Sequence, residues 1–113
     1  MRYSLFFLLI ILCSCTYNEL DPISDCDSDN PSFAICVKPI IDNNCLGCHS
    51  ESSLNGDLSS YESIQEYIIN QDLLDRVQRN INEIGFMPLG GNKLDDQQID
   101  ILIKWRNNGA PNN

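Results

Sequence analysis

Histidine and positive charge are both scarce in this chain of 113 residues. It has one histidine, and 7 Lys and Arg side chains stand against 16 Asp and Glu, which gives a net charge of −9. Binding to nucleic acid is therefore not expected, because it depends on clustered basic side chains. No paired carboxylates, activated serine or second histidine suggest an enzyme. No strand-like alternation of apolar and polar residues occurs, so an all-α fold is predicted.

Long apolar runs are also missing. The run Leu5–Leu12 is far shorter than the about 20 residues that a membrane-spanning helix needs. Arg2 before it and small residues after it are typical of a signal peptide, predicted over residues 1–14. Leu12-Cys13-Ser14-Cys15 resembles a bacterial lipobox, which predicts a lipid on Cys15 and attachment to a membrane of the cell envelope, facing the periplasm or exterior. The alternative is ordinary secretion with Cys15 as an unmodified thiol.

Residues 15–31 are rich in acidic and turn-forming side chains and offer little to bury. This composition is typical of a solvated, flexible segment, here a tether that could extend to about 50 Å. Within and just after it, Cys26 and Cys36 are expected to form a disulfide, because the protein leaves the cytoplasm. The alternative is two unpaired thiols, with Cys36 buried on the first helix. The globular domain is predicted over residues 32–113.

The stretch Cys45-Leu46-Gly47-Cys48-His49 has the spacing that attaches haem c covalently. The two thiols add across the vinyl groups of the porphyrin, and the imidazole becomes an axial ligand of the iron. The single histidine of the chain falls at the one position that this chemistry requires. Two alternatives are disfavoured: a zinc site would have to recruit Cys26 and Cys36, and a thioredoxin-like redox pair would follow a strand.

Two helices are predicted on either side of this motif. The first begins near Lys38, after a looser turn, and its apolar face runs into Cys45. The second begins at a capping box formed by Ser59 and Glu62 and continues to about Glu66.

Two further helices are predicted downstream. The third begins near residue 70 and continues past Ile81 to Ile84, both on its apolar stripe. The last begins at a capping box formed by Asp95 and Gln98 and ends at Gly109. Its expected buried stripe consists of Ile99, Leu102 and Ile103.

Met87 lies in an irregular loop, Gly85–Gly91, between these two helices. It is the only methionine left once the signal peptide is removed. If a thioether is the sixth ligand of the iron, Met87 must supply it. The alternative is that Met87 only fills a gap in the core, with the iron five-coordinate or bound by a weaker ligand.

From about Ser32 to Asn113 the order of these features resembles a class I cytochrome c. Met87-Pro88 before Gly90-Gly91, and Trp105 before Gly109-Ala110-Pro111, are similar to small planctomycete-type cytochrome c domains of secreted bacterial proteins and lipoproteins. The resemblance implies an all-α bundle whose first and last helices close around one covalent haem. The proline whose carbonyl orients the proximal histidine in that family is missing. A carbonyl within Leu54–Leu58 is expected to orient His49 Nδ1 instead.

The expected function is one-electron transfer between ferrous and ferric haem, with His49 and Met87 as the axial ligands of the iron. Loss of Arg2 with the signal peptide changes the net charge from −9 to −10. A redox partner with a basic docking patch is therefore expected. The alternatives are a haem-based sensor that binds a diatomic gas at an open or displaceable distal site, and an adaptor lipoprotein in which haem only supports folding.

Cys15→Ala is expected to abolish incorporation of labelled palmitate and to release the protein from the membrane fraction. Several acyl chains on Cys15 would otherwise hold it there, since each buried methylene contributes about 0.8 kcal/mol. Cys13→Ala is the matched control and should keep both the label and the membrane attachment. A wild type without label would support ordinary secretion.

Overall fold

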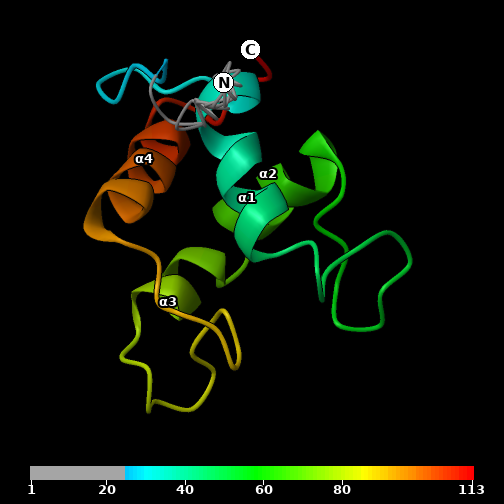
Figure 1. Ribbon diagram of the computed structural model, residues 1–113. Helices are drawn as coiled ribbons and strands as arrows, with labels where there is room; N and C mark the ends of the chain where they lie inside the picture. Colours follow the sequence, from blue (N-terminus) through cyan, green and yellow to red (C-terminus); the bar gives the residue numbers. More distant parts are fainter. Residues whose placement is uncertain (1–24) are drawn as a thin grey trace, which may run out of the picture.

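The computed structural model describes residues 25–113, which form helices joined by loops, with no strand among them (Figure 1). In chain order the elements are a π-helical turn η1 (Phe33–Val37) and the helices α1 (Lys38–Asn44), α2 (Tyr61–Ile69), α3 (Leu73–Gln78) and α4 (Asp96–Asn107). The predicted all-α class is confirmed for this part of the chain. Within residues 25–113, no helix has the length and apolar character needed to cross a membrane.

The first helical segment begins after Ser32, whose hydroxyl accepts a hydrogen bond from the Ile35 amide (3.3 Å). The π-helical turn ends at Val37, and the regular helix α1 begins at Lys38 with Pro39 in its first turn. Proline fits there because the first turn of a helix has no acceptor for its missing N–H. The predicted start near Lys38, after a looser turn, is confirmed.

Three aromatic side chains join η1, α2 and α4. Trp105 of α4 is fully buried, and its ring centroid lies 5.7 Å from that of Phe33 and 6.3 Å from that of Tyr61. Trp105 Nε1 donates to Pro111 O (3.0 Å), and the Tyr61 hydroxyl donates to Ala110 O (2.8 Å). Both rings therefore bury their apolar faces while their polar ends are hydrogen-bonded.

Cys26 and Cys36 form a disulfide, as predicted, with their Cα atoms 5.1 Å apart. The bond holds the residues that precede the domain against η1, and Asp29 adds an ion pair to Lys104 of α4 (3.4 Å). A disulfide fits a protein exported to an oxidising compartment. The predicted signal peptide, Cys15 and the tether up to residue 24 lie outside the described residues.

Capping boxes begin both α2 and α4. The box of α4 pairs Asp95 with Gln98, as predicted, whereas that of α2 pairs Ser60 with Ser63, one residue later than predicted. The side chains of α4 that are fully buried are Ile101, Leu102 and Trp105. Of the predicted buried stripe, only Leu102 is fully buried. Ile99 and Ile103 are partly buried. The buried face is set by Trp105, because residues four apart such as Ile101 share its side of the helix.

The third helix is shorter than predicted, and that prediction is wrong beyond Gln78. Ile81 and Ile84, expected on its buried stripe, are 59% and 97% exposed. The chain leaves the helix because Asn80 and Glu83 close a local turn. The Glu83 carboxylate accepts hydrogen bonds from the backbone and side-chain amides of Asn80 (2.8 and 3.0 Å). Such side-chain bonds compete with the helical hydrogen-bond ladder.

Trp105→Ala is expected to lower the free energy of unfolding by about 3 to 5 kcal/mol, the usual cost of truncating a large buried aromatic side chain. Urea unfolding followed by circular dichroism measures the loss. Ile35→Ala on η1 is the control, because Ile35 is 49% exposed and its truncation should cost less than about 1 kcal/mol. Equal losses in the two variants would contradict the central role given to Trp105.

Candidate functional site

The segment Cys45–His49 follows α1 directly and forms a tight turn at its end. Cys45 N donates to Ile41 O (2.8 Å), and the amides of Cys48 and His49 both donate to Cys45 O (3.1 and 3.0 Å). Both cysteines have free thiols; Cys45 is half-buried and Cys48 is exposed. The turn therefore brings three of the predicted site residues together, with two thiols and one imidazole leaving the chain within a few residues.

The His49 ring is held by a backbone carbonyl. Nδ1 lies 3.0 Å from Gly56 O, and since a carbonyl can only accept, Nδ1 carries the proton in this hydrogen bond. Nε2 is then the nitrogen with an available lone pair, which is the one that can bind a metal. The acceptor lies within Leu54–Leu58, where the sequence predicted it.

The loop of residues 50–57 closes back on the motif and extends away from α4 (green in Figure 1). Leu58 N donates to His49 O (2.8 Å), which joins the two ends of the loop. Ser53 Oγ donates to Cys48 O (2.8 Å) and fixes the middle of the loop to the motif. These bonds keep the acceptor for His49 Nδ1 close to its donor.

Tyr67 of α2 packs against Gly56. A Cβ atom added at Gly56 would lie 2.2 Å from the Tyr67 hydroxyl oxygen, far inside van der Waals contact. Gly56 also has φ +102°, a conformation that side chains other than glycine adopt only with strain. Helix α2 therefore fixes, through Tyr67, the residue whose carbonyl orients His49.

The state of the cysteines disfavours both alternatives to haem attachment. Burial raises the pKa of the Cys45 thiol to about 11, which disfavours thiol–disulfide exchange because that reaction uses the thiolate. Cys26 and Cys36, which a zinc site would have to recruit, are bonded to each other. In the part of the chain that the structure describes, no three His, Cys, Asp or Glu side chains are grouped to hold a metal ion.

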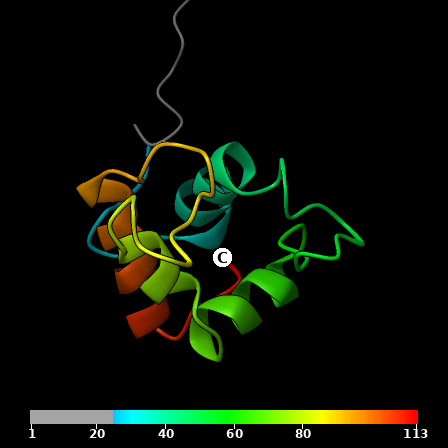
Figure 2. The same ribbon diagram turned by 90° about the horizontal axis from the view of Figure 1, so that it is seen from below.

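Met87 comes from a separate segment, the loop between α3 and α4 (yellow in Figure 2). Its side chain is half-buried and packs against the hydrophobic core, and its amide donates to Arg76 O of α3 (3.2 Å). The Met87–Pro88 peptide bond is cis. In Figure 2 this loop, the end of α1 and the loop after His49 are arranged around the same central region of the molecule.

The donor set fits haem c. Two free thiols, an imidazole with Nε2 available and a thioether from another segment are the groups that attach and ligate such a haem. Comparisons of the chain with protein-family models, with curated proteins and with solved structures found no match. The function is therefore inferred from the residues and contacts described above.

Three residues that support the site were not predicted: Gly56, Tyr67 and Arg76. The pair Asn55-Gly56 indicates a turn, but the sequence does not show which carbonyl of that turn meets the imidazole. Tyr67 follows the predicted end of the second helix near Glu66, whereas the structure continues α2 to Ile69. Its partner lies in a loop, so no helical spacing indicates the contact. Arg76 contributes its backbone carbonyl, which no side-chain pattern reveals.

Gly56→Ala is expected to lower the free energy of unfolding by about 2 kcal/mol or more. The left-handed conformation alone costs about 1 kcal/mol, and the new methyl group would collide with Tyr67. Urea unfolding measures the loss. Gly90→Ala is the matched control, because Gly90 has φ +73° but no atom within 4 Å of an added Cβ, so only the conformational cost should remain. Equal losses would show that the Tyr67 contact contributes nothing.

Proposed function

We propose that this protein is a lipid-anchored c-type cytochrome of the class I fold that transfers single electrons at the bacterial cell envelope. The observation that carries the proposal is the turn of Cys45, Cys48 and His49, with Nδ1 bonded to Gly56 O and Nε2 available. Among the alternatives, only covalent haem attachment uses two thiols and a directly following imidazole.

Each site residue has a distinct role in this proposal. Cys45 and Cys48 would hold haem c through two thioether bonds, and His49 Nε2 and Met87 Sδ would be the protein's two ligands of its iron. The bound haem supplies a one-electron couple between ferrous and ferric iron. If His49 and Met87 both ligate the iron, no coordination position would remain for a substrate, which favours electron transfer over catalysis.

His49 and Met87 would act on the reduction potential of a bound haem in opposite directions. The hydrogen bond from His49 Nδ1 to Gly56 O makes the imidazole a stronger donor, which would favour the ferric state. The thioether of Met87 is a weak, soft donor, which would favour the ferrous state and raise the potential. Because Tyr67 fixes Gly56, the packing of α2 contributes to the balance.

The charge distribution supports a redox partner with a basic docking patch. Four ion pairs join a cation to an acid four residues away: Lys38–Asp42, Arg76–Asp72, Arg79–Asp75 and Lys104–Asp100. Positive charge is thus largely neutralised within single helices, while the chain keeps its acidic excess. Glu51, two residues after His49, is exposed beside the motif. Complementary charge would speed the encounter with the partner.

A haem-based sensor of a diatomic gas is the second candidate. The observation that favours it is the position of Met87 on a loop rather than on a helix. Loops open at a lower free-energy cost than packed helices, so a competing ligand could displace Met87 more readily than His49.

The first test is the visible spectrum of the purified mature protein, oxidised and reduced, with and without carbon monoxide. We expect a low-spin reduced spectrum, a thioether-to-iron band in the oxidised protein and no binding of carbon monoxide. Met87→Ala should lose the band and bind carbon monoxide. Leu89→Ala is the matched control, because Leu89 lies in the same loop and is 79% exposed; it should behave like the wild type.

Other outcomes would favour an alternative function or refute the proposal. A high-spin wild type that binds carbon monoxide would favour the sensor. Very slow electron exchange with every mediator would favour an adaptor lipoprotein in which haem only supports folding. A purified protein without covalent haem would refute the proposal.

A further inference from the structure

We propose that Arg79 is a positioning residue that holds the loop of Met87 against α3. The inference rests on the proposed function in one respect only, the role of Met87 as an iron ligand. The structural argument concerns how a charged side chain at the end of a short helix fixes the loop that follows it.

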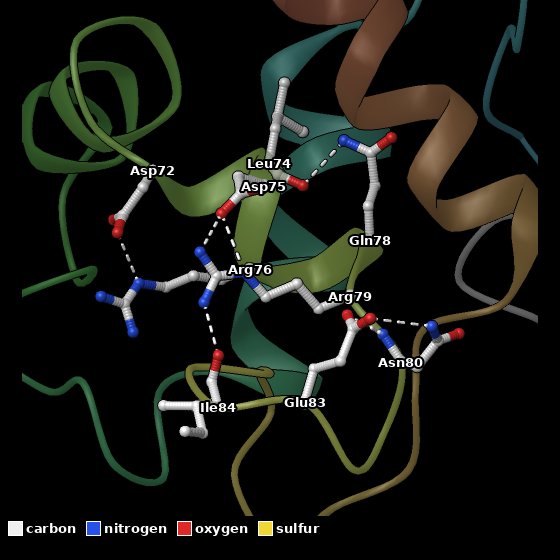
Figure 3. Close-up of polar contacts among 9 residues, drawn as sticks. All are labelled: Asp72, Leu74, Asp75, Arg76, Gln78, Arg79, Asn80, Glu83 and Ile84. Atoms are coloured by element: carbon white, nitrogen blue, oxygen red, sulfur yellow. Dashed lines mark hydrogen bonds and ion pairs between the residues drawn. The ribbon is translucent and has the colours of Figure 1, made fainter.

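The guanidinium of Arg79 is bonded both to its own helix and to the loop (Figure 3). Nε and Nη2 donate to the carboxylate of Asp75, one turn earlier, with an Nε–Oδ2 distance of 2.9 Å. Nη1 donates to Ile84 O at 2.6 Å. Because the donors of a guanidinium have fixed directions in one plane, the bonds to Asp75 aim Nη1 at the loop.

The turn at Gly85 leaves space for the Arg79 side chain. A Cβ atom added at Gly85 would lie 2.2 Å from Arg79 Nη1, so the guanidinium occupies the space that a side chain would need. Gly85 also has φ +83°, which favours glycine. On the other side of the turn, the Asn80 amides hydrogen-bond to the Glu83 carboxylate and hold its pKa below the ordinary value.

The bond from Arg79 can affect Met87 because only a few residues of the chain separate Ile84 from Met87. Gly85 is followed by Phe86, which is buried, and then by Met87, whose amide donates to Arg76 O. The side chain of Ile84 is 97% exposed and does not hold the loop. In the part of the chain described, the bond from Arg79 is the only hydrogen bond that joins Ile84 to α3. Without it, the bond between the Met87 amide and α3 should open more often.

Arg76 provides a matched comparison on the same helix. It pairs with Asp72 four residues earlier, with an Nε–Oδ2 distance of 2.7 Å, and its side chain is 37% exposed against 32% for Arg79. Among the described residues, its side chain forms no hydrogen bond with the loop. Replacing either arginine by glutamine removes one positive charge and one ion pair from α3. Only the change at Arg79 also removes the bond to Ile84.

The experiment compares full-length, haem-loaded wild type with Arg79→Gln and Arg76→Gln. Hydrogen exchange of the Met87 amide, followed by NMR of the reduced protein, should be about tenfold faster in Arg79→Gln, as expected for the loss of one charge-assisted hydrogen bond. It should change less than about twofold in Arg76→Gln, because exposed ion pairs contribute little and the substitution keeps the backbone carbonyl that accepts from the Met87 amide. Carbon monoxide, which the wild type is not expected to bind, should bind slowly to Arg79→Gln as Met87 is released.

Asp75→Asn serves as a second variant, which keeps the Arg79 guanidinium but weakens the hydrogen bonds that orient it. Its Met87 amide should exchange at a rate between those of the wild type and Arg79→Gln. Wild-type exchange in Arg79→Gln, or equal acceleration in both arginine variants, would overturn the proposal. A wild type without a thioether-to-iron band would refute ligation by Met87, and amide exchange would still decide the role of Arg79.

Discussion

The packing of Trp105 against Phe33 and Tyr61 is the contact on which the rest of the structure depends. The three rings come from α4, η1 and α2, which are far apart in the chain, so their burial closes the fold. Helix α1 continues directly from η1 and ends at Asn44, immediately before Cys45. The position of the attachment turn is therefore set by an aromatic cluster at the other end of the first helical segment.

The two sides of the candidate site are held by different kinds of interaction. His49 is oriented by a carbonyl whose position depends on close packing of Tyr67 against Gly56. The loop of Met87 is attached to α3 by hydrogen bonds, one of them from a partly exposed guanidinium. Close packing opens only with a larger disruption, whereas exposed polar contacts exchange readily with water. The site thus combines a rigid side with one that can yield.

The sequence alone predicts the structure correctly where the interactions are local. The start of α1 near Lys38, the capping box of α4 and the disulfide between Cys26 and Cys36 depend on neighbouring residues or on cysteine count, and the structure has all three. The third helix was overestimated, because the apolar spacing of Ile81 and Ile84 did not reveal the turn that Asn80 and Glu83 close. The expected carbonyl near His49 was found, although only its five-residue window could be predicted.

The disulfide has a consequence for how far the domain can travel from a membrane. It joins Cys26 to η1, and the ion pair of Asp29 with Lys104 holds the following residues on α4. For a chain anchored at Cys15, the segment from Cys15 to Cys26 spans at most about 35 to 40 Å even when fully extended, less than a segment that continues to Pro31. The point at which the chain joins the domain is also fixed, at the disulfide. The protein would therefore sample a limited range of heights and tilts above the lipid, which narrows the set of partners that it can meet.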